Sequence, residues 1–266
     1  MLDALSYEFM QNALIAGILV SLISGIIGSL IVVNRMVFLA GGIAHAAYGG
    51  IGIAIFTGIP IFLGTTLFAV VAALFMAFVT LNQKDKIDTF TGLIWAVGMA
   101  IGIILVDLTP GYNVDLMSYL FGSILAVNRE DLYFMASLFV IIIVVMTFWY
   151  RDILAVSYDS EYAALSGINV KFFYTLILIL SALTVVIAIK VVGLILVIAL
   201  LTIPIYIAQN LSSSLYSMMI ISGLVASCFT IVGLWFSYSF DLTSGACIIL
   251  VSALSLMIFM IVQKVK

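Results

Sequence analysis

The chain has 266 residues, of which 66% are hydrophobic and only 8% are charged, and its formal net charge is −3 at pH 7. This composition and a mean hydropathy of +1.40 exclude an ordinary soluble globular protein and indicate an integral membrane protein. The sequence has no cluster of Lys and Arg, which argues against a nucleic-acid partner.

Hydrophobic runs of membrane length predict an all-α polytopic bundle of eight or nine transmembrane helices. The runs occupy about 9–33, 37–57, 61–81, 90–108, 131–150, 172–189, 193–208, 216–236 and 244–262. The separators between them are short and polar, so residues 1–266 are predicted to form a single transmembrane domain. The first run is expected to be retained, because the acidic N-terminus lacks the basic region of a cleaved signal peptide.

The second run carries His45, the only histidine in the sequence. At ~1.5 Å rise per residue, His45 lies ~15 Å beyond Arg35, near the middle of a ~30 Å hydrocarbon layer. An ionisable side chain at that depth is costly and often belongs to a substrate or ion path. A histidine that forms hydrogen bonds between helices is the alternative interpretation.

Small residues recur every four positions in several runs and predict close helix packing. In the second run they are Gly42, Ala46, Gly50 and Ala54. The first run has a similar stripe that could pack against this one, and the fourth run offers a further pair (Gly17, Ser21, Gly25 and Ser29; Gly98 and Gly102).

The separators predict a consistent orientation. With the N-terminus outside and the spans alternating, most basic residues lie on the cytoplasmic side, as the positive-inside rule requires. The segment 116–128 is too short to cross and is predicted to be a re-entrant or interfacial helix on the outer side. The cytoplasmic residues are Arg35, Lys84, Lys86, Arg151, Lys171, Lys264 and Lys266, and the outer ones are Arg129 and Lys190.

Two polar stretches of the second half are expected on the cytoplasmic side. Residues 156–170 form an amphipathic stretch with Asp159 and Glu161 and a helix stop at Gly167. Pro204 is expected to kink or end its helix, and 206–216 to form a short surface helix. That helix is either a docking element for a partner or an ordinary connection.

Signatures of catalysis are missing. The sequence has no GxxxxGK[ST], HExxH, CxxC or GxSxG pattern, and one histidine cannot build a multi-histidine metal cage. Cys228 and Cys247 lie in predicted spans and are expected to pack inertly. The chain is therefore not expected to be an enzyme.

Five segments in the right order resemble the ABC-3 group of ABC importer permeases for zinc, manganese and iron. Residues 38–50 resemble FLGDxLSHAxLPG, and residues 113–132 resemble VDLMxYLFGxxLAVxxEDL. Residues 159–170 are similar to DxExAxxxGV, residues 190–208 to KxVGxLLxxALLxIPAAxA, and residues 241–254 to DxPxGAxIVLxxAL.

The resemblance implies a type II-like permease in the cell membrane, with the C-terminus cytoplasmic and no permanently bound cofactor. A cytoplasmic ATPase dimer, an extracellular metal-binding protein and a second permease copy, in a homodimer, would be its partners, and a divalent metal ion its substrate. His45 would be a transient metal contact, and Asp115 and Asp241 would lie at the outer mouth. The residues implied to couple to the ATPase are Ile207, Ala208, Gln209, Asn210, Leu211, Ser212, Ser213, Asp159 and Glu161.

One departure from the family pattern bears on which metal the chain would carry. The family places an aspartate four residues before the histidine, where this chain has Gly41, and Ala44 replaces the neighbouring serine. Zinc, manganese and iron all stay open. The alternatives are a permease for a metal chelate such as a siderophore or corrinoid, a secondary transporter or channel, and a structural membrane subunit without transport.

Overall fold

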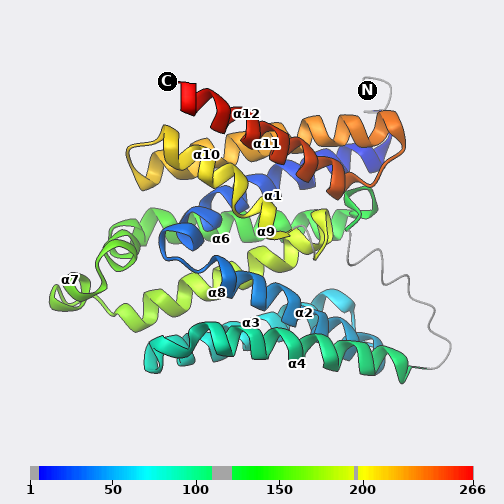
Figure 1. Cartoon of the computed structure of the whole chain (residues 1–266). Coiled ribbons are helices and arrows are strands. Elements are labelled where there is room, and N and C mark those ends of the chain that lie inside the picture. Colours follow the sequence, from blue (N-terminus) through cyan, green and yellow to red (C-terminus); the bar gives the residue numbers. More distant parts are fainter. Residues whose placement is uncertain (1–5, 110–121, 195–196, 266) are drawn as a thin grey trace. The chain divides into compact units, whose positions relative to one another are not determined.

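A computed structural model describes residues 6–109, 122–194 and 197–265, and every regular element in those ranges is helical (Figure 1). Within these ranges, eight helices are long and apolar enough to cross a membrane. The all-α membrane bundle is therefore confirmed. The long helices are α1 (Glu8–Val33), α2 (Val37–Thr57), α3 (Ile61–Asn82), α4 (Ile87–Asp107), α6 (Arg129–Tyr158), α8 (Val170–Val192), α11 (Leu215–Phe240) and α12 (Ser244–Val265).

Short helices connect the long ones. They are η2 (Lys84–Lys86), η3 (Ile124–Ala126), α7 (Ser160–Leu165), α9 (Val197–Leu200) and α10 (Ile203–Leu211). Residues 116–121 of the segment 116–128, which was predicted to be re-entrant, lie outside the described residues, and the described remainder contains the short helix η3.

The chain divides into two compact units that interleave in sequence. Unit 1 comprises Met1–Val32, Leu116–Val145 and Ile187–Lys266, and unit 2 comprises Val33–Asp115 and Met146–Val186. Helices α6 and α8 each contribute to both units. The single transmembrane domain expected from the sequence stays a prediction.

In unit 1, α1 packs against α11. The expected contact between its stripe and that of the His45 helix, which belongs to unit 2, stays a prediction. The hydroxyls of Ser21 and Thr230 lie 2.9 Å apart, and Ser222 Oγ donates to the Gly25 carbonyl at 3.0 Å. A Cβ on Gly25 would lie 2.5 Å from Gly223 Cα, so the two backbones touch there. Hydroxyl pairing and small residues together form this contact, as is common between membrane helices.

The same contacts define the two ends of unit 1. Because residues 17 to 29 of α1 meet residues 230 to 222 of α11, these helices run antiparallel. At one end, Arg129 Nε pairs with Glu8 Oε1 at 2.7 Å. At the other end, Gln263 Nε2 donates to Asn210 Oδ1 at 3.0 Å. The chain therefore passes from the first end to the second between α8 and α11.

That crossing was expected as a span at 193–208 with a kink or a helix end at Pro204, and it is interrupted there. It contains two short helices, α9 and α10, and the helical pattern is interrupted at Leu201 and Thr202. Pro204 occupies the first turn of α10, where its missing N–H costs nothing. The break lies just before the proline because Pro204 has no N–H to donate to the carbonyl four residues earlier.

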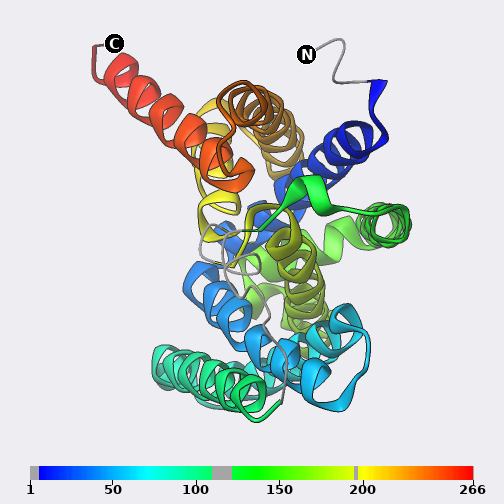
Figure 2. The same ribbon diagram turned by 90° about the vertical axis from the view of Figure 1, so that its right-hand side faces the viewer.

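Unit 2 contains α2, α3 and α4 side by side (Figure 2). Helix α2 meets α4 along one stripe, at Gly42 against Thr91, Gly49 against Gly98 and Gly52 against Gly102. Residue numbers rise together in these pairs, so α2 and α4 run parallel. A second side of α2, at Gly50 and Ala54, contacts α3 at Gly64.

The closeness of α2 and α4 gives a stability prediction. A Cβ on Gly52 would lie 2.5 Å from the Gly102 carbonyl oxygen and 2.6 Å from its Cα, whereas a Cβ on Gly92 of α4 would meet nothing within 4 Å. We expect Gly52→Ala to destabilise the chain by about 1–3 kcal/mol through overpacking, and Gly92→Ala to stay within about 1 kcal/mol of the parent. Thermal unfolding midpoints in detergent measure both, and equal midpoints for the two variants would contradict the packing.

Candidate functional site

His45 lies well inside α2 and is stacked on Trp95 of α4. The two ring centroids are 4.1 Å apart and the ring planes differ by 6°. The contact is possible because Gly98, one turn beyond Trp95, brings α4 so close that a Cβ there would lie 2.6 Å from Ala46 Cα. His45 is partly exposed, so the ring is accessible along part of its edge.

The His45 ring has no polar anchor among the described residues: its Nδ1 is buried and has no hydrogen-bond partner. Gly41 and Ala44, which stand where the family has an aspartate and a serine, are both buried in α2. In the described part of the chain, no three His, Cys, Asp or Glu side chains are grouped so that they could hold a metal ion. A single imidazole suits a passing ion better than a resident one.

The predicted coupling segment falls on α10 and the turn after it. Its helix begins at Ile203 and ends at Leu211, which corrects the expected range of 206–216. Ile207 and Ala208 are buried, Ser212 is half-buried, and Gln209, Asn210, Leu211 and Ser213 are exposed.

The exposed side of this segment is apolar as well as polar. Leu211 is 58% exposed and Tyr216, at the start of α11, is 62% exposed. Asn210 is engaged locally, because its Nδ2 donates to the Tyr206 carbonyl and its Oδ1 accepts from Gln263. Exposed apolar side chains beside a turn at the end of a membrane unit form a suitable docking surface.

Asp159 and Glu161 lie in unit 2, on the short helix α7 and its cap. Asp159 Oδ1 accepts from the backbone N–H groups of Glu161 and Tyr162, so this carboxylate is the N-cap of α7. The helix stop at Gly167 is confirmed, with φ at +82° and the N–H of Ile168 bonded to the Ala163 carbonyl. The expectation that these acids share a surface with 207–213 of unit 1 stays a prediction.

Of the two outer-mouth candidates, Asp115 lies outside the described residues. Asp241 is exposed and ends α11 in the left-handed conformation, with φ at +53°. It lies at the same end of unit 1 as the pair formed by Glu8 and Arg129, because α11 runs antiparallel to α1. The sequence-based assignment of these residues to one side of the membrane agrees with that geometry.

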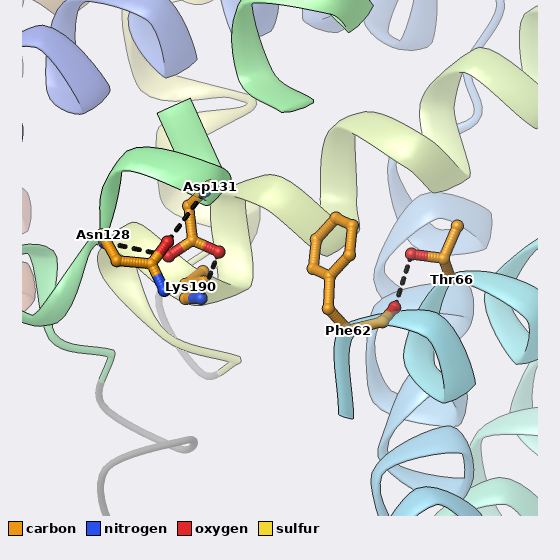
Figure 3. A network of polar contacts seen from close by, with 5 residues as sticks. All are labelled: Phe62, Thr66, Asn128, Asp131 and Lys190. Carbon is orange, nitrogen blue, oxygen red and sulfur yellow. Dashed lines mark hydrogen bonds and ion pairs between the residues drawn. The ribbon is translucent and has the colours of Figure 1, made fainter. Parts of the chain in front are cut away.

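A buried polar network at this end was not predicted from the sequence (Figure 3). Asn128 and Asp131 exchange side-chain-to-backbone hydrogen bonds at 3.0 and 2.9 Å, which form a capping box at the start of α6. Asp131 Oδ1 also pairs with Lys190 Nζ near the end of α8. The spacing of Asn128 and Asp131 could have indicated the cap, but nothing local indicates the partner from α8.

The network joins three segments of unit 1. Besides the ion pair, the Ser123 N–H donates to the Lys190 carbonyl at 3.3 Å, which ties the residues before η3 to the end of α8. The other bond in Figure 3 is independent of it, since Thr66 donates to Phe62 within α3 of unit 2.

A bundle of membrane-length helices, with one intramembrane histidine and an exposed apolar turn, defines a membrane transport subunit. The chain belongs to the ABC 3 transport family, which matches residues 6–263. It is therefore an ABC transporter permease subunit and not an enzyme, because in such transporters a separate subunit hydrolyses ATP.

Relatives extend the match over nearly the whole chain. An uncharacterized membrane protein of Synechocystis sp. is 48% identical over 97% of this chain and 92% of its own length. The manganese transport system membrane protein MntC of Listeria monocytogenes is 35% identical over 94% and 89%, respectively. Among solved structures, PsaBC of Streptococcus pneumoniae in complex with Fab matches with a TM-score of 0.87 at 31% identity, covering 97% of this chain and 93% of that one.

A second solved structure shares the fold alone. It is an inward-facing conformation of a putative metal-chelate type ABC transporter, with a TM-score of 0.71 at 18% identity, covering 94% of this chain and 85% of that one.

The buried network gives the second prediction. Asp131→Asn removes the charge opposite Lys190, and we expect it to destabilise the chain by about 1–3 kcal/mol, the range for hydrogen bonds to charged groups. Lys190 is 34% exposed on its side chain, so water moderates the loss. Thermal unfolding in detergent measures the effect.

The matched control is Glu8→Gln, which breaks the exposed pair with Arg129 and should cost less than about 1 kcal/mol. In the double variant Asp131→Asn/Lys190→Met, part of the lost stability should return. An Asp131→Asn midpoint equal to that of Glu8→Gln would show that the buried pair contributes nothing.

Proposed function

We propose that the chain is the membrane subunit of an importer that carries a divalent transition-metal ion into the cytoplasm, with manganese as the first candidate. The observation that carries the proposal is the end-to-end match to permeases named for manganese transport, at 35% identity over 94% of the chain. His45, the only histidine, lies well inside a span where such an ion would pass.

Two features of the donor set bear on selectivity. An imidazole with no carboxylate beside it among the described residues disfavours Mg²⁺ and Ca²⁺, which need oxygen ligands, and suits zinc and iron. Manganese also prefers oxygen ligands, so its place as first candidate rests on the relatives and not on this donor set. A weak contact with one ligand also lets the ion leave, which conduction requires.

The energy would enter through partner subunits. A cytoplasmic ATPase dimer would dock on α10 and the turn at 212–214, an extracellular metal-binding protein would deliver the ion, and a second copy of the chain would complete the conduit. The N-terminus would be outside and the C-terminus cytoplasmic, an orientation supported by the distribution of Lys and Arg. A metal-chelate permease is not favoured, because the structure of that type shares 18% identity and the fold alone.

Replacement of the histidine tests the path. We expect His45→Ala to lower the initial rate of ⁵⁴Mn²⁺ uptake, in cells that express the complete transporter, by roughly tenfold or more, since the imidazole is the ligand that the ion would meet. Phe56→Ala is the control, because this side chain lies near the end of α2 and is 53% exposed. Unchanged uptake by His45→Ala at equal membrane abundance would remove His45 from the path.

A charge on the docking surface tests the coupling. We expect Leu211→Glu to reduce recovery of the co-expressed ATPase subunit with the purified permease about tenfold, because an exposed apolar anchor would be lost from the interface. Phe240→Glu, which puts the same charge on a 63% exposed side chain at the opposite end of α11, should leave recovery unchanged. If Leu211→Glu recovers as much ATPase as the parent, the ATPase docks elsewhere.

A further inference from the structure

The hydrogen bond that usually orients a metal-binding histidine is missing at Nδ1 of His45 among the described residues. A histidine that ligates a metal normally donates its other ring N–H to a carboxylate or backbone carbonyl, which fixes the ring plane. Among the described residues, Nδ1 of His45 has no such partner, and the residue one turn earlier is Gly41, which has no side chain to offer.

The flat contact with Trp95 can fix the ring plane instead. With ring centroids 4.1 Å apart and planes within 6°, rotation of the imidazole about χ2 would drive its edge into the indole. Rotamer changes are further limited because Ala46 and Gly98 hold the two helix backbones in contact beside the stack.

The indole is itself held in place from two sides. Its Nε1–H donates to Met99 Sδ at 3.1 Å, one turn along α4. Phe38, two turns before His45 on α2, lies with its ring centroid 6.4 Å from that of Trp95 at an angle of 52°. Met99 therefore holds the indole of Trp95 on α4, and the indole in turn contacts the His45 ring on α2.

We infer that Trp95 is the positioning residue for His45, and that its indole sets the direction from which a divalent metal ion binds the imidazole. This inference rests on the proposed function. The lone pair of an imidazole nitrogen lies in the ring plane, and metal–nitrogen bonds are ~2.0–2.2 Å long. Because the two rings are parallel, the ion binds at the edge of the stack, beside the indole and not over its face.

A transport assay separates positioning from structure. Trp95→Leu removes the flat surface and keeps much of the bulk. At equal membrane abundance we expect it to lower the rate of ⁵⁴Mn²⁺ uptake at saturating metal about tenfold, the effect of losing an outer-shell partner of a ligand. The KM should stay near that of the parent, because it reports the binding protein that delivers the ion. Trp95→Phe keeps a flat ring and should retain the rate to within about threefold of the parent. An unchanged rate in Trp95→Leu would overturn the inference, as would an equal loss of rate in both variants.

A spectroscopic assay reports the geometry directly. In the full-length chain with Trp149→Phe and Trp235→Phe, reconstituted in nanodiscs, Trp95 is the remaining tryptophan. Paramagnetic Mn²⁺ bound beside the indole should quench its fluorescence saturably, whereas diamagnetic Zn²⁺, which an imidazole also binds, should quench it much less, and His45→Ala should abolish the saturable part. Quenching that is absent, or that survives in His45→Ala, would overturn the inference.

Different results would contradict the positioning role of Trp95 and the proposed function. If His45→Ala loses uptake while Trp95→Leu keeps the parent rate, the positioning role falls and the proposed function stands. If neither substitution alters uptake, the proposed path through His45 falls and the inference falls with it.

Discussion

The backbone contact between α2 and α4 is the constraint on which the candidate site depends. Glycines on both helices let them run side by side at a distance that no larger residue permits, as at Gly52 and Gly102. Only at that distance can the indole of Trp95 lie flat on His45. In a membrane, where water gives helices no hydrophobic reason to associate, such close packing supplies the association energy itself. The stripe of small residues therefore also sets the surroundings of the candidate histidine.

In unit 1, polar side chains join the helices. Serine and threonine hydroxyls join α1 to α11, and the network of Asn128, Asp131 and Lys190 ties the start of α6 to the end of α8. Each group is costly in a nonpolar setting unless it is paired. Pairing within the unit meets that cost, and it also fixes which ends of the helices lie together.

Much of the fold could be predicted because a membrane-spanning helix is recognised from the mean hydropathy of about 20 consecutive residues and does not depend on any single one. The boundaries of α2, expected at 37–57, agree with the structure, since Arg35 and Gly58 to Pro60 interrupt the apolar run on both sides. The crossing at 193–208 and its interruption near Pro204 were expected, but hydropathy does not show that the break lies before the proline, at Leu201 and Thr202. His45 was evident from its rarity, but its partner was not: Trp95 lies fifty residues away in sequence and is one of three tryptophans without distinguishing local context. The pairing of Asp131 with Lys190 was hidden for the same reason, because periodicity identifies the faces of a helix and not their partners.

The interrupted crossing between α8 and α11 has a mechanical consequence. A continuous helix is a stiff rod, and a displacement at one end of it appears at the other. Here the backbone ladder becomes irregular before Pro204: the Thr202 N–H bonds to the Ala199 carbonyl, three residues back, and the Thr202 hydroxyl bonds to the carbonyl of Ile198. Under the proposed coupling, a load applied to α10 would be absorbed in part as rotation at that joint. Strain from the turn at 212–214 would then pass to α11 and α12, which α10 contacts, more than along the chain toward Lys190.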